Sequence, residues 1–138
     1  MLTWNEQFAT GSPTIDEQHR ELIRQCNEFE SLLGHTNPTT HDIAVVIEFL
    51  DFLEGYVSRH FSYEEQCMAS ARCPAHQQNR EAHTHFKQMF QQHKAHAQKE
   101  GFRLELLVEL NNAIHAWIKD HILRVDTELK PCLARPAA

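Results

Sequence analysis

The chain has 138 residues, of which 41% are hydrophobic and 23% are charged, a composition typical of one soluble globular domain. Its formal net charge of -6 argues against nucleic acid or an anionic membrane surface as the main partner. No apolar run approaches the roughly 20 residues that a spanning helix needs. Because no secretory signal is visible either, we expect a cytoplasmic protein without membrane insertion.

Four segments have the apolar spacing of amphipathic helices, and short connections join them. Four such helices most simply form an all-α, up-down-up-down four-helix bundle, here a single domain over residues 1–138. The predicted segments are about 15–33, 40–70, 74–99, and 102 to beyond 123.

The two ends of the chain are expected to differ. Residues 1–14 form an N-terminal arm, on which Trp4 and Phe8 are expected to pack against the bundle. Residues 131–138 form a short, frayed tail, because Pro131 is expected to limit the last helix.

Four cysteines stand at positions 26, 67, 73 and 132. No two of them have C-x-x-C spacing, so neither a zinc ribbon nor a thioredoxin-type pair is expected. We expect free, mostly buried thiols in a reducing compartment.

Each predicted helix carries a polar residue where its apolar face calls for a hydrophobic one. Burying such groups is costly unless each finds a partner. One inward histidine is commonly a satisfied core residue, but inward polar groups on four helices favour one shared metal site. Imidazole and carboxylate suit iron, manganese or zinc. The residues are His19, His60, Glu64, Asn79, His83, His121 and, just beyond the last of these, Asp126.

The spacing of these residues constrains the site. His60 and Glu64 are one helical turn apart and can reach the same ion. His121 and Asp126 are five residues apart, about 140° around a helix, so the helix must distort, for example by a π-type turn, or end there. No H-E-x-x-H or E-x-x-H occurs, which excludes a zincin protease and the ferritin-like di-iron pattern.

Two strings carry a resemblance to a known family. H-F-x-x-E-E-x-x-M begins at His60 and W-x-x-x-H-I-x-x-x-D begins at Trp117. With the Ile15–His19 stretch before them and His83 between them, in this order, the chain resembles the hemerythrin family, in particular its bacterial single-domain members.

The resemblance implies a bundle that holds two non-haem irons, bridged by carboxylates and by an oxo or hydroxo group. One iron takes two histidines and keeps a position open for O2, and the other takes three. On the matching positions, His19 and His60 would bind the first iron, and His83 and His121 the second. Glu64 and Asp126 would be the bridges, and Trp117 and Ile118 would line the oxygen pocket.

One position departs from the family pattern, because Asn79 stands where the family has a histidine. An amide is a poorer iron ligand than imidazole. Water could fill the position, His76 could replace the missing ligand, or the second iron could bind weakly. A second open position also predicts a shorter-lived oxygenated form.

The resemblance implies an oxygen-binding protein for carriage, storage or delivery, with O2 as its partner and no identified protein partner. The alternatives are an O2 or redox sensor acting through a separate partner, or a di-iron enzyme that consumes peroxide or nitric oxide. We expect no enzyme activity beyond a side reaction of the peroxidase type.

Ligating imidazoles usually donate their second nitrogen to a further group. Asp16, Glu17 and Gln18 are candidates for that role, and Glu65 is expected at the surface or behind a ligand. The histidines expected in solvent are His35, His41, His85, His93, His96 and His115.

Overall fold

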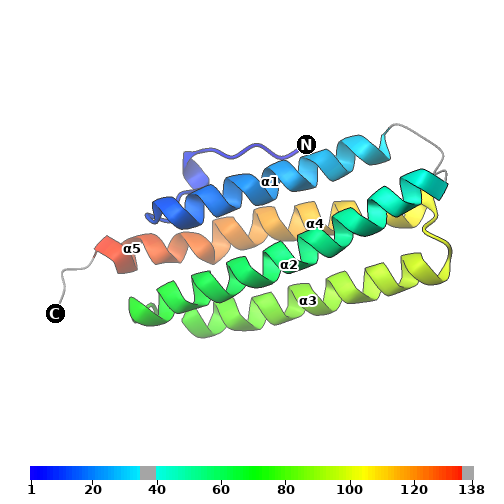
Figure 1. Ribbon diagram of the computed structural model, residues 1–138. Helices are drawn as coiled ribbons and strands as arrows, with labels where there is room; N and C mark the ends of the chain where they lie inside the picture. Colours follow the sequence, from blue (N-terminus) through cyan, green and yellow to red (C-terminus); the bar gives the residue numbers. More distant parts are fainter. Residues whose placement is uncertain (35–39, 135–138) are drawn as a thin grey trace.

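The computed structural model describes residues 1–34 and 40–134, and Figure 1 shows four long helices side by side with alternating direction. They are α1 (Pro13–Leu33), α2 (Thr40–Ser70), α3 (His76–Lys99) and α4 (Leu104–Arg124). Each helix packs against the next, and α4 packs back on α1. The predicted all-α bundle is therefore confirmed, and the described ranges contain no strand.

Local chemistry explains where the helices begin and end. The Ser12 hydroxyl accepts a hydrogen bond from the Ile15 amide and caps α1. Between α3 and α4, Gly101 and Phe102 adopt φ angles of 73° and 58°, a left-handed conformation that breaks the helix. The helix α4 therefore begins at Leu104 and not at residue 102.

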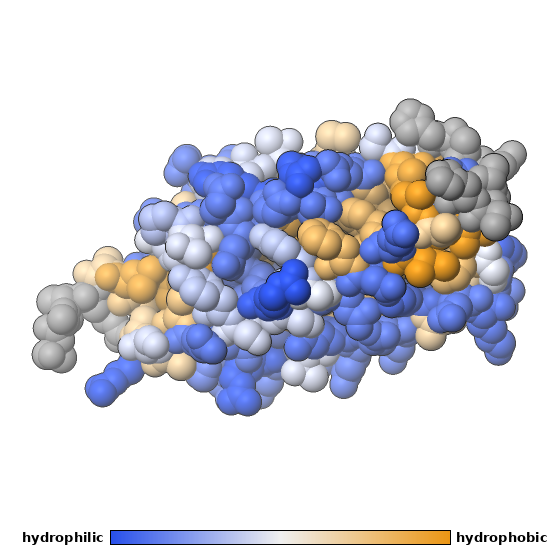
Figure 2. All heavy atoms as spheres, in the orientation of Figure 1, coloured by the Kyte–Doolittle hydropathy of each residue, from blue (hydrophilic) through white to orange (hydrophobic). Residues whose placement is uncertain are grey.

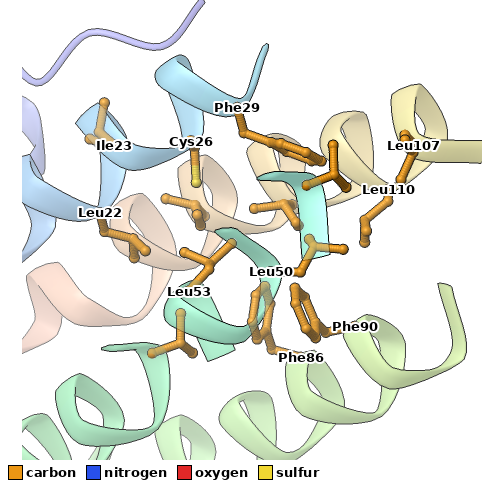
Figure 3. Close-up of a cluster of buried hydrophobic side chains, with 14 of the residues drawn as sticks. Leu22, Ile23, Cys26, Phe29, Leu50, Leu53, Phe86, Phe90, Leu107 and Leu110 are labelled. Carbon is orange, nitrogen blue, oxygen red and sulfur yellow. The ribbon is translucent and has the colours of Figure 1, made fainter. Parts of the chain in front are cut away.

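The apolar core fills the half of the bundle near the α1–α2 and α3–α4 connections. Figure 3 shows side chains of all four helices pointing into it, among them Phe29, Leu50, Phe90 and Leu107. All four are at most 2% exposed, and burying each such side chain contributes about 1.5–3 kcal/mol. The inward polar residues lie in the other half of the bundle, which also contains a smaller apolar cluster around Ile15, Met68 and Leu129.

A short 3₁₀ helix, η2 (Asp126–Glu128), and the helix α5 (Leu129–Ala134) close that other half. Pro131 was expected to limit the last helix, but it lies in the first turn of α5, where its missing N–H costs nothing. Residues 131–134 are thus helical rather than a frayed tail, and the rest of the predicted tail, 135–138, lies outside the described residues.

The prediction of free thiols is wrong for two of the four cysteines. Cys73, in the α2–α3 turn, forms a disulfide with Cys132 on α5, across a sequence separation of 59 residues. Cys26 and Cys67 are free. No spacing rule points to this pair, because only the packing of α5 on the α2–α3 turn brings the two residues together.

The N-terminal arm packs on the bundle as predicted. It contains the 3₁₀ helix η1 (Glu6–Phe8), from which the Phe8 side chain enters the main core. Trp4 packs at the edge of this core, with the Arg20 guanidinium 4.1 Å above its ring. The arm is two residues shorter than predicted, because α1 begins at Pro13.

The surface is mainly hydrophilic on the face shown in Figure 2, with hydrophobic atoms gathered where α2 begins and a smaller group near α5. Among the described residues, no helix has the length and apolar character that would let it cross a membrane. His85 and His96 are exposed as expected, whereas the half-buried His115 lies with its Nε2 3.1 Å from the Cys26 carbonyl. The side chains of His35 and His41 lie outside the described residues.

Candidate metal centre

The inward polar residues of the four helices meet in one buried cluster. The helix α1 contributes His19, α2 and α3 contribute two residues each, and the end of α4 and η2 contribute one residue each. Each of these residues is at most 5% exposed. The cluster consists of His19, His60, Glu64, Asn79, His83, His121 and Asp126.

The chain places Asp126 in the cluster by ending α4. The helix stops at Arg124, and Asp126 is the first residue of the 3₁₀ helix η2. The five-residue spacing from His121 required the helix to distort or end. It ends, and a 3₁₀ turn follows in place of a π-type turn.

The donor atoms form two sets that share both carboxylates. Within each set, all the donor atoms lie within 4.8 Å of one another. One set is His19, His60, Glu64 and Asp126, and the other is Glu64, His83, His121 and Asp126. Two ions could therefore lie side by side with Glu64 and Asp126 between them.

Each carboxylate turns one oxygen toward each set. Glu64 Oε2 lies 3.1 Å from His19 Nε2 and 3.3 Å from His60 Nε2, and Oε1 lies 3.2 Å from His83 Nε2. Asp126 divides in the same way, because Oδ2 lies 3.1 Å from His19 Nε2 and Oδ1 lies 3.0 Å from His121 Nε2. This division is the arrangement that a pair of bridging carboxylates requires.

Two donor atoms of the second set are buried without a hydrogen-bond partner among the described residues. They are His83 Nε2 and Asp126 Oδ1. His83 Nε2 lies near Glu64 Oε1, and Asp126 Oδ1 lies near His121 Nε2, but neither contact is a hydrogen bond. Since an unpaired buried polar atom is costly, an ion at this place would satisfy both, and the residues present fit a metal.

The electrostatics of the cluster also favour a cation. Burial opposes charge on His19, but the hydrogen bonds of its ring with Asp126 and Glu64 outweigh burial and raise the pKa of His19 to about 10. Burial would raise the pKa of Glu64, yet the surrounding imidazoles hold this pKa well below its usual range. Both shifts have the direction expected when two buried carboxylates attract a positive charge between them.

Asn79 lies inside the cluster, at the position where the family pattern has a histidine. Its Nδ2 donates to Glu64 Oε1 at 3.1 Å, and its Oδ1 lies 2.8 Å from His121 Nε2. His76, the possible substitute, is half-buried at the start of α3 and belongs to neither donor set.

Two side chains hold ligand rings from behind. Gln18 Oε1 accepts a hydrogen bond from His60 Nδ1 at 2.7 Å, and Glu65 Oε2 lies 3.2 Å from His83 Nδ1. Both residues are among the candidates for such a role, and Gln18, on α1, reaches a ring of the neighbouring helix α2. The Nδ1 atom of His19 has no hydrogen-bond partner among the described residues.

Aromatic rings cover the second set. Phe61 stacks on His83 with the ring centroids 3.7 Å apart, and Trp117 stacks on His121 at 4.3 Å. Ile118, next to Trp117, is 2% exposed. Of the two residues predicted to line an oxygen pocket, Trp117 contacts a ligand ring directly.

A buried site with two shared carboxylates and histidines from four helices is one in which a four-helix bundle could hold metal ions. The family model described as "Hemerythrin HHE cation binding domain" matches residues 10–133. The chain therefore belongs to the hemerythrin family.

Curated relatives support this assignment at low identity. A bacteriohemerythrin of Stenotrophomonas maltophilia is 26% identical over 122 residues, which cover 88% of this chain and 74% of the relative. A bacteriohemerythrin of Clostridium acetobutylicum is 26% identical over 141 residues, covering 93% of this chain and 98% of the relative. One from Pseudomonas aeruginosa strain PAO1 is 23% identical over 125 residues, covering 91% and 76%.

Proposed function

We propose that this chain is a non-haem di-iron protein that binds O2 reversibly for carriage, storage or delivery. The observation that carries the proposal is the division of Glu64 and Asp126, each with one oxygen toward either donor set. Two ions held this close by shared anionic ligands can act on one small molecule together. Membership of the hemerythrin family supports iron as the metal.

The donor sets suggest which residues would hold each iron. His19 and His60 would bind one, His83 and His121 the other, and the two carboxylates would bridge them with a solvent-derived oxo or hydroxo group. Two adjacent ferrous ions supply two electrons that O2 can accept and return.

The protein's own contribution is to exclude water from the metal centre. Phe61 and Trp117 stack on the rings of His83 and His121, and the buried Ile118 follows Trp117 in the chain, so that these side chains would limit the access of water and protons. Because reduction of bound O2 consumes protons, apolar surroundings of this kind favour the release of O2 over its reduction. We propose that O2 reaches the centre through a pocket lined by Trp117 and Ile118.

The test is an optical spectrum of protein loaded with Fe²⁺ without oxygen, then exposed to air, then returned to vacuum. We expect a visible absorption band that appears with O2 and disappears on its removal. His83→Ala should abolish the band, whereas His85→Ala, an exposed histidine on the same helix, should keep it. A band that persists after O2 is removed would contradict reversible binding.

A second candidate function is the consumption of peroxide, which Asn79 favours because it stands where the family pattern has a third histidine for the second donor set. We propose this only as a side activity. Steady-state turnover of hydrogen peroxide by the iron-loaded protein separates the two functions, because a carrier should show little turnover and an enzyme should show saturable turnover.

A further inference from the structure

The side chain of Asn79 differs from the other members of the cluster in carrying no charge and no imidazole. It is 0% exposed, one turn before His83 on α3. Glu64 Oε1 can only accept hydrogen bonds, so the amide nitrogen of Asn79 must face Glu64 and the amide oxygen must face His121. The orientation of the amide is thus fixed by its neighbours.

The two donor sets have the same composition. Each has two imidazole nitrogens and one oxygen from each shared carboxylate. Only the second set is contacted by Asn79, which hydrogen-bonds two of its four donor atoms, Glu64 Oε1 and His121 Nε2. An ion entering this set must break those two bonds, and the amide oxygen that it meets is a weaker donor to iron than imidazole.

We propose that Asn79 makes the second set a weaker metal site, so that the centre fills in two separate steps and the second ion exchanges more readily than the first. The proposal rests on the metal centre described above and adds a regulation to it. Because a centre that acts through two ions needs both, the supply of iron would set the fraction of active protein. At limiting iron the chain would hold one ion, bound by His19, His60 and the two carboxylates.

The experiment is a titration of metal-free protein with Fe²⁺ in the absence of oxygen, against a competing chelator, with bound iron per chain as the readout. We expect two steps, the second about 10- to 100-fold weaker than the first. Asn79→His should strengthen the second step by about tenfold or more and leave the first unchanged.

Two further variants separate a local effect from a general one. Gln78→His adds an exposed imidazole at the adjacent position and should titrate like the wild type. Asn79→Ala removes the two hydrogen bonds without adding a ligand, so it should strengthen the second step by less than Asn79→His does. Circular dichroism of each variant checks that the bundle is formed.

The proposal is overturned if the wild type binds two ions in one step, or if Asn79→His leaves the second step unchanged. Because no oxygen is present, the result does not depend on the proposed function. Two binding steps without a reversible O2 band would contradict the proposed oxygen carriage and leave the role of Asn79 standing. A reversible O2 band with one-step binding would contradict only the role of Asn79.

Discussion

Gln18 and Glu65 show how single residues set the chemistry of a ligand ring. Each lies at the Nδ1 atom of an imidazole whose Nε2 faces the carboxylates. An acceptor at Nδ1 keeps the proton on that nitrogen and leaves Nε2 free as a ligand. Glu65, being anionic, also makes the His83 ring a stronger donor.

Glu65→Gln should therefore weaken metal binding by about 10- to 100-fold while leaving the fold intact, because the amide keeps the shape but loses the charge. Competition with a chelator measures the effect. Glu81→Gln is the matched control, since Glu81 is an exposed carboxylate on α3 whose partner is Gln77. Equal losses in both variants would point to a general charge effect and not to support of His83.

Asn79 also leads to a prediction about the oxygenated protein. Exchange at a second open position invites the loss of bound O2 by oxidation of the centre. We therefore expect the oxygenated form of the wild type to decay faster than that of Asn79→His, as measured by stopped-flow spectra after mixing with O2. A slower decay of the wild type would contradict this reasoning.

At the scale of elements, the end of α4 matters most. The chain leaves the α-helix after Arg124, and η2 turns Asp126 toward the same centre as His121. Leu129, the next residue after η2, is fully buried against Ile15 and Met68. This apolar contact anchors the turn that carries Asp126.

Leu129→Ala should lower the free energy of unfolding by about 2–5 kcal/mol and also weaken metal binding. Leu107→Ala removes an equally buried leucine from the main core, about 20 Å along α4 from His121. It should cost a similar free energy of unfolding but leave metal affinity unchanged. Urea unfolding and chelator competition on both variants give the comparison, and identical metal affinities would mean that Leu129 does not position Asp126.

At the scale of the whole molecule, the disulfide between Cys73 and Cys132 is a covalent constraint. It closes a loop with a sequence separation of 59 residues, which contains α3 and α4. Restricting the unfolded chain in this way stabilises the folded protein by about 2–4 kcal/mol. The free thiol of Cys26 takes no part, because burial raises its pKa to about 12 and keeps it unreactive.

Reduction of the protein should accordingly lower the free energy of unfolding by about 2–4 kcal/mol in urea. The double variant Cys73→Ser/Cys132→Ser should show the same loss and no further response to the reductant. Cys67→Ser should respond to reduction as the wild type does. If the reductant leaves wild-type stability unchanged, the disulfide contributes nothing to it.

The bundle and most of the cluster follow from helical periodicity and from polar residues on apolar faces, because both signals are local. His60 and Glu64 share a face by spacing alone. The disulfide and the hydrogen bond from His60 to Gln18 depend on which surfaces pack together, so no local pattern could predict them. The helix α5 was missed because Pro131 was taken as a helix limit, although a first turn tolerates proline.

The stacking of Trp117 on His121 has a practical consequence for anyone who studies this protein. The chain has 2 tryptophans, and the other, Trp4, lies on the N-terminal arm above Arg20 and outside both donor sets. Iron or cobalt arriving at His121 would quench the fluorescence of the indole stacked upon that ring. Tryptophan fluorescence thus reports the metal occupancy of the second donor set, and the emission of Trp4 should change less.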